Sequence, residues 1–195
     1  MEGAAVLRAE GCRLMGSFEF TDETVAHIAE KFNIDRQTIK TLYDKYADIH
    51  KRMKSQYLAH VMRSLEDFVR EACHAPSFRI TCTPSSNNPA IKGTGCASYQ
   101  KNHSFNILFD SMLNAREARV VIAHELGHLF SIITFGMEYK DKHEPLSSVF
   151  GIFTIIDKNN FYANETRPLL HHSCNDIVDD FALLKNRADE RYNIS

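Results

Sequence analysis

The chain has 195 residues, of which 44% are hydrophobic and 25% charged, and its formal net charge is −2. This size and balance predict a globular protein with one domain, or with a small module joined to a domain. The weak net charge excludes a strong overall field toward nucleic acid or an anionic membrane. We find no apolar run of about 18 residues and therefore expect no membrane-spanning helix.

The five cysteines are scattered and odd in number, and none forms a Cys-x-x-Cys pair. This usage is typical of reduced thiols in a cytosol rather than of a disulfide framework. The first 20 residues include Glu2, Arg8 and Arg13, and they lack the unbroken apolar core of a signal peptide. We therefore expect a cytoplasmic protein.

Residues 1–56 are expected to form a helical N-terminal segment. Apolar side chains recur at helical spacing from Val25 to Phe32 and from Ile39 to Tyr46, with a short turn at Asn33. This pattern resembles a helix-turn-helix, in which residues 35–40 would begin the recognition helix. Residues 21–54, however, carry seven Lys/Arg and six Asp/Glu, and they lack the basic stripe of a DNA reader. DNA binding is thus weakly supported, and two helices packed for structure or for partner contact are the alternative.

Residues 57–195 are expected to form the main domain, of class α+β. Leu58 begins a helix that Pro76 terminates. Alternating apolar side chains predict strands over 78–83 and 105–109, with a shorter strand over 97–100 and a loop between. The helix and strands precede a further apolar helix, so we expect a small antiparallel or mixed sheet. The last strand would present its free edge to an extended peptide.

The most informative motif is His-Glu-x-x-His, formed by His124, Glu125 and His128 within a largely apolar stretch. On a helix, residues four apart share one face, so the two imidazoles can bind one metal ion. Glu125 then lies beside the metal, where it can take a proton from an activated water. This is the arrangement of zinc metalloproteases.

The predicted motif helix has clear ends. Asn114, with Glu117 three residues later, predicts a capping box, and Gly136 predicts the stop. Gly127 in the helix interior indicates a close approach of another backbone or of the substrate. After the stop, the polar residues 140–145 are expected to form a solvated turn, and the apolar residues 147–156 a hairpin strand or a short helix. A loop over 157–168 and a helix from Asn175, capped by Ser173, complete the chain.

A catalytic zinc site uses three protein ligands and an open position. For the third ligand we favour Asp176, with Asp179 and Asp180 as neighbours on the same helix. The alternative is that these carboxylates only complement the helix dipole. His143 and Glu144 are assigned to the solvated turn. Other candidates in the sequence are Glu165, His171 and His172.

The segments Phe-Asn-Ile-Leu-Phe-Asp at 105–110 and Arg-Val-Val-Ile-Ala-His-Glu-Leu-Gly-His-Leu at 119–129 resemble the ImmA/IrrE family of metallopeptidases. The later helix resembles that family's E-x-x-A-N/D-x-F-A pattern through Asp179, Phe181 and Ala182. The glutamate position of the pattern falls on Asn175, with Asp176 next to it. The resemblance covers about residues 60–135 and 173–185.

The resemblance implies a zincin-like domain, Zn²⁺ held with a later acidic residue, and in some members an attached helix-turn-helix. It also implies a substrate class, since family members cut DNA-binding repressors in stress or mobile-element responses.

The sequence therefore predicts a zinc-dependent endopeptidase of narrow specificity, with Glu125 as general base and His124, His128 and Asp176 as metal ligands. Its substrate would be a protein or peptide, such as a transcriptional repressor, and no membrane would be involved. The alternative is a catalytically weak regulatory protein on a zincin scaffold that binds DNA or a protein partner. A third interpretation is a metal-dependent hydrolase of a non-peptide substrate.

Overall fold

The computed structural model describes residues 21–52, 58–86, 95–101, 103–137, 140–155 and 174–190. These residues form an α+β fold, as predicted, with one three-stranded mixed sheet and six helices in the described part. The elements in chain order are α1 (Asp22–Phe32), α2 (Arg36–His50), α3 (Leu58–Ala72), β1 (Arg79–Ser85), β2 (Gly95–Gln100), β3 (Ser104–Asp110), α4 (Ala115–Phe135), α5 (Lys140–Ile155) and α7 (Cys174–Glu190).

The N-terminal helices form as predicted. Asn33 ends α1 in a left-handed conformation with φ of 52°. Asp35 begins α2, because its side chain accepts a hydrogen bond of 2.8 Å from the Thr38 backbone N–H. The buried faces of both helices join one hydrophobic core with α3, α4, α5 and α7. The predicted domain boundary after residue 56 lies outside the described residues.

The sheet has the strand order β1-β3-β2, with β1 parallel and β2 antiparallel to β3. Ile80 of β1 pairs with Phe105, and Ala97 of β2 pairs with Ile107. The expectation that β3 presents a free edge is wrong, because β3 lies between the other two strands. Strand order depends on pairing between segments far apart in the chain, which the alternation within one strand does not encode.

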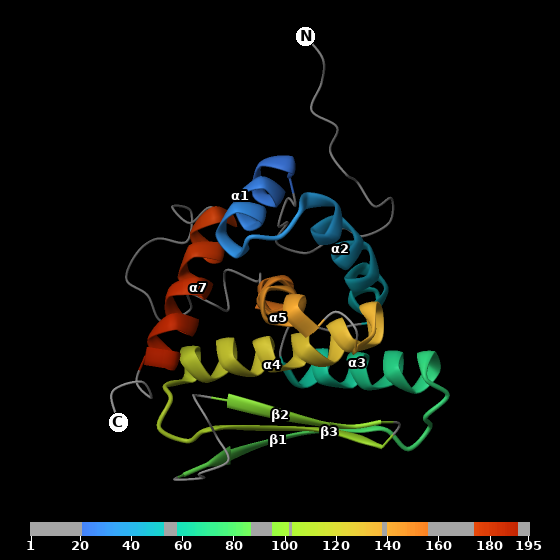
Figure 1. The fold of residues 1–195 in the computed structure, drawn as a ribbon. Helices are drawn as coiled ribbons and strands as arrows, with labels where there is room; N and C mark the ends of the chain where they lie inside the picture. Colours follow the sequence, from blue (N-terminus) through green and yellow to red (C-terminus); the bar gives the residue numbers. More distant parts are fainter. Residues whose placement is uncertain are drawn as a thin grey trace.

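The motif helix α4 lies against one face of this sheet, beside α3 (Figure 1). It begins with the predicted capping box of Asn114 and Glu117 and ends at Gly136. By length and composition alone α4 could cross a membrane, but 56% of its 18-residue apolar stretch is buried inside the fold. Its apolar side chains belong to the hydrophobic core, as in the core helix of a globular domain.

Helix α5 corrects the prediction of a solvated turn over 140–145, because those residues are helical. Pro145 lies in the second turn, so its missing N–H leaves unpaired only a carbonyl of the first turn. The rest of α5, up to Ile155, agrees with the short helix that was predicted for 147–156 as the alternative to a hairpin strand. Its apolar side chains Leu146, Val149, Phe150 and Phe153 are all buried, and this burial stabilises the helix across the proline.

The packing of α4 against α5 is unusually close. A Cβ atom added to Gly127 would lie 2.5 Å from the Cα atom of Ser147. This confirms the prediction that Gly127 allows another backbone to approach. In Figure 1 the layers follow in the order sheet, α3 with α4, α5, then α1 with α2, while α7 flanks α4 and α1. Helix α5 therefore lies between the metal-motif helix and the N-terminal pair.

Candidate metal centre

The three motif residues come together as one turn of α4 predicts. The ligand atoms of His124, Glu125 and His128 lie within 4.8 Å of one another, so the group could hold a metal ion. His124 and Glu125 are only 2% and 7% exposed, and the His128 side chain is 20% exposed. Buried imidazole and carboxylate groups are unfavourable without a partner or a metal. Of these three side chains, His128 is the most exposed to solvent.

A fourth side chain, from α5, faces both imidazoles. Glu144 places Oε2 at 3.1 Å from Nε2 of His124 and Oε1 at 3.3 Å from Nε2 of His128. Sequence reasoning assigned Glu144 to a solvated turn, and its side chain is indeed 73% exposed. The close contact of α5 with α4 nevertheless turns its carboxylate toward the two histidines.

The distances between these three side chains fit a tetrahedral metal site. Zinc–ligand bonds of about 2.0–2.2 Å in a tetrahedron separate neighbouring ligand atoms by about 3.3–3.6 Å. The two N···O separations of 3.1 and 3.3 Å differ from these values by only a few tenths of an ångström. Two imidazoles with one carboxylate are also a known catalytic zinc set. The donor chemistry and the spacing therefore both suit Zn²⁺.

The second ring nitrogen of His124 also has a partner on α5. Nδ1 of His124 lies 3.0 Å from Oγ of Ser148, and both side chains are buried. Glu144 and Ser148 are four residues apart, so they share one face of α5. The four-residue spacing of Glu144 and Ser148 is visible in the sequence. It has meaning only on a helix, whereas a turn was predicted over 140–145.

The side chain of Glu125 lies close to Gly95, the first residue of β2. A Cβ atom added to Gly95 would lie 3.1 Å from Oε1 of Glu125 and 2.5 Å from Cγ1 of Val121. Only glycine leaves room there, so the start of β2 lies directly against the carboxylate. Glu125 is therefore placed between the imidazoles and the end of a strand.

The electrostatics of the group favour the protonation states that a metal needs. Burial lowers the pKa of His124 to about 4, although a hydrogen bond with Glu144 opposes this shift, so the imidazole is neutral at pH 7. Hydrogen bonds with His124 and His128 hold the pKa of Glu144 well below its ordinary value. The neutral imidazole of His124 and the ionised carboxylate of Glu144 are forms that can bind a metal.

The pKa of Glu125 moves in the other direction. Burial raises it, while electrostatic interactions with His128 and Lys185 oppose that rise. Lys185 lies on α7 and pairs with Asp189 at 2.7 Å, and its side chain is only 17% exposed. The C-terminal half of α7 thus contributes the cation Lys185 to the surroundings of the site. The sequence alone did not identify this residue.

Of the three candidate aspartates of α7, Asp179 pairs with side chains of α1. Oδ1 of Asp179 accepts from Lys31 at 2.7 Å and lies 3.1 Å from Nε2 of His27, so this carboxylate joins α7 to α1. Asp176 lies half-buried in the first turn of α7, and its assignment as a metal ligand stays a prediction. Asp180 is also half-buried on this helix. Glu165, His171 and His172 lie outside the described residues.

Four cysteines lie in the described part of the chain, Cys73, Cys82, Cys96 and Cys174, and none of them forms a disulfide there. Burial, with the nearby negative charge of Glu125, raises the pKa of the Cys82 thiol to about 11. This thiol is therefore protonated at neutral pH, whereas a metal binds the thiolate.

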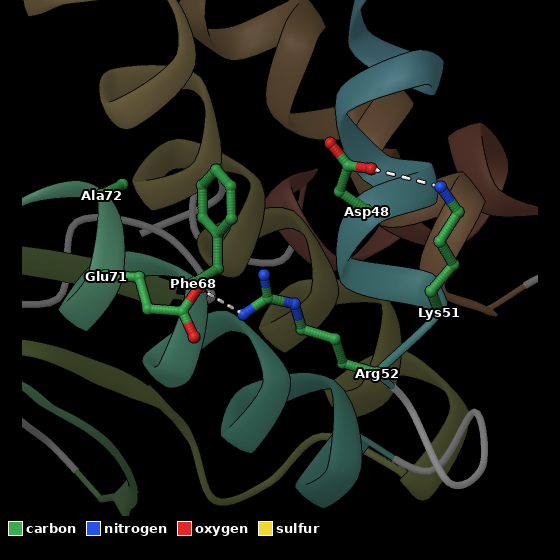
Figure 2. Close-up of a pocket in the computed structure, with 6 residues that line it drawn as sticks. All are labelled: Asp48, Lys51, Arg52, Phe68, Glu71 and Ala72. Carbon is green, nitrogen blue, oxygen red and sulfur yellow. Dashed lines mark hydrogen bonds and ion pairs between the residues drawn. The ribbon is translucent and has the colours of Figure 1, made fainter.

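A surface pocket lies elsewhere, between the end of α2 and α3 (Figure 2). Phe68 lines it, and its charged side chains pair with one another, Arg52 with Glu71 at 2.8 Å and Lys51 with Asp48 at 3.4 Å. The residues that line it include no histidine or cysteine. The candidate metal-binding residues of α4 and the Glu144 carboxylate of α5 are not among the residues that line this pocket.

Comparisons of the chain with protein-family models, with curated proteins and with solved structures find no match. The resemblance to a peptidase family therefore depends on the motif residues alone. What the sequence and the fold establish together is an α+β protein whose buried His-Glu-x-x-His group, on a long helix packed against a mixed sheet, could hold a metal ion.

Proposed function

We propose that this protein is a zinc-dependent endopeptidase with a zincin-like domain. The observation that supports this most strongly is the Glu144 carboxylate held between the two Nε2 atoms of the motif, with Glu125 beside them. A metal-binding motif on a helix is common to several activities. A third ligand and a free carboxylate at the same point favour hydrolysis.

In this proposal His124, His128 and Glu144 hold the zinc ion. Glu144 replaces Asp176, which the sequence favoured, because its oxygens already lie 3.1 and 3.3 Å from the two imidazoles. Glu125 is left as the proton carrier, because Glu144 contacts both imidazoles while the Glu125 carboxylate lies beside Gly95 on β2. Each of the two carboxylates thus has one role.

When bound, zinc would polarise the scissile carbonyl and lower the pKa of water at the site. Glu125 takes the proton of the attacking water on a carboxylate oxygen and returns it to the nitrogen of the leaving amine. Its burial raises the pKa of this carboxyl group above the ordinary value. One water is consumed and one C–N bond is broken, so the proton balance closes.

The substrate would bind along β2. Among the described strands β2 pairs only with β3, so it is an edge strand of the sheet beside which an extended peptide could add. Gly95 at the start of β2 lies against Glu125, so a peptide added to this edge would pass the catalytic carboxylate. Backbone recognition of this kind suits an endopeptidase.

The resemblance to the ImmA/IrrE family supports two narrower proposals. The first is that the substrate is a DNA-binding repressor in the cytoplasm, cut during a stress or mobile-element response. The second is that α1 and α2 contact this partner or its DNA. Their mixed charge favours the protein partner over DNA.

Metal content of purified, zinc-replete protein tests the ligand set. We expect one zinc per chain in the wild type, a large loss in Glu144→Gln, and no loss in Asp176→Asn, which serves as the matched control. The reverse pattern would restore Asp176 as the ligand. A stoichiometric metal that persists after both His124→Ala and His128→Ala would contradict the metal site itself.

Digestion of a proteome-derived peptide library, read by mass spectrometry, tests the activity. The zinc-loaded wild type should produce a small set of cleavages, and Glu125→Gln should retain zinc but produce none. If zinc binds and no peptide is cut, the peptidase proposal fails while the metal site stands. That outcome would favour the regulatory alternative.

A further inference from the structure

We propose that Ser148 is a positioning residue for His124, fixing the ring so that Nε2 faces the metal position. This inference depends on the proposed zinc site and adds a residue that the ligand set does not contain. It is carried by the 3.0 Å contact between Nδ1 of His124 and Oγ of Ser148, on the side of the ring opposite Glu144.

The two contacts of His124 both come from α5, and together they fix the plane of the ring. Nε2 meets Glu144 at 3.1 Å and Nδ1 meets Ser148 at 3.0 Å. A histidine that binds a metal through one nitrogen needs a partner for the other nitrogen, which sets ring orientation and tautomer. Because His124 is 2% exposed, solvent has little access to provide that partner.

A hydroxyl is well suited to this place, because it can both donate and accept a hydrogen bond. Without metal, a neutral His124 donates from Nε2 to Glu144 and accepts at Nδ1 from the Ser148 hydroxyl. With zinc bound at Nε2, the ring would carry its proton on Nδ1 and donate it to Ser148. The Nε2 proton would pass to water and Nδ1 would take one from water, so the ring would stay neutral and keep the same contact.

The neighbouring serine provides the control. Ser147 is also fully buried on α5, but its hydroxyl donates to the backbone carbonyl of His143 and contacts no imidazole. Ser147→Ala therefore removes a buried hydroxyl from the same helix turn without changing the surroundings of His124. Any general effect of such a deletion on α5 will appear in both variants.

The experiment measures the dissociation constant of Zn²⁺ by competition with a chromophoric chelator in full-length protein. We expect Ser148→Ala to bind zinc about 10- to 100-fold more weakly than the wild type, Ser147→Ala to bind it normally, and Ser148→Thr to recover much of the loss. Equal affinity of Ser148→Ala and wild type, or equal losses in the two alanine variants, would overturn the proposal.

A second measurement does not require any variant to fold. Nitrogen-15 NMR of the wild-type imidazoles should show the His124 proton on Nε2 without metal and on Nδ1 with Zn²⁺ bound. A loaded ring with no proton on Nδ1 would overturn the role of Ser148. A wild type that binds no Zn²⁺ would instead contradict the proposed function, and with it this inference, so the two failures can be distinguished.

Discussion

Gly127 provides the sharpest test of how the fold builds the site. The substitution Gly127→Ala would place a methyl group 2.5 Å from Cα and 2.8 Å from the carbonyl carbon of Ser147. Ordinary carbon–carbon contacts are about 3.5–4.0 Å, so α4 and α5 must separate by about 1 Å at this point. No side-chain rotation relieves the contact, because the atoms of Ser147 belong to the backbone.

Two consequences follow for stability and for metal binding. Alanine gains about 1 kcal/mol of helix propensity over glycine, while overpacking of a core costs about 1–3 kcal/mol or more. A backbone clash belongs at the upper end of that range, so we expect a net loss of about 2 kcal/mol in the free energy of unfolding. Metal–ligand distances tolerate only about 0.2 Å, so a separation of 1 Å should also remove Glu144 from the site.

Urea unfolding of the metal-free protein and a Zn²⁺ competition titration measure the two effects separately. Gly151→Ala is the matched control, since its methyl group would mainly meet the Phe181 ring, at 2.7 Å, which can shift. We expect the control to be destabilised but to bind zinc more tightly than Gly127→Ala does. A Gly127→Ala protein that is about 1 kcal/mol more stable than wild type, as propensity alone predicts, and that binds zinc normally would refute the reasoning.

Three further predictions concern the caps, the α1–α7 contact and the metal. Asp35→Ala should lower the free energy of unfolding by about 1 kcal/mol at pH 7, because the cap of α2 is lost; an unchanged urea midpoint would contradict this. Asp179→Asn should lower it by less than about 1 kcal/mol, because the ion pairs are half exposed. Although burial opposes the shift, Lys31 and His27 lower the pKa of Asp179, so its contribution is present above the unfolded pKa and is lost as pH falls through the folded one. Urea melts at pH 7 and pH 3 should therefore show a difference that shrinks in acid, and one that grows would be inconsistent with this sign. Finally, free Zn²⁺ at about 100 times its dissociation constant should raise the free energy of unfolding by about 2.7 kcal/mol, and EDTA should reverse the gain; the same gain in His124→Ala would exclude binding at this site.

The sequence by itself determined the features that depend on neighbours along the chain. The helical period brings His124 and His128 onto one face of α4, and the capping box of Asn114 with Glu117 forms through local hydrogen bonds. The strands of the sheet were predicted for the same reason, since alternation of apolar side chains is a property of each strand alone.

Only the tertiary structure decided the features that depend on which elements meet. Glu144 and Ser148 reach the imidazoles because Gly127 lets α5 pack closely on α4, and Pro145 made that helix difficult to predict. The pairing of β3 on both edges likewise depends on strands distant in sequence. The period of apolar residues indicates which face of a helix or strand is buried. Which other element covers that face depends on packing across the whole core.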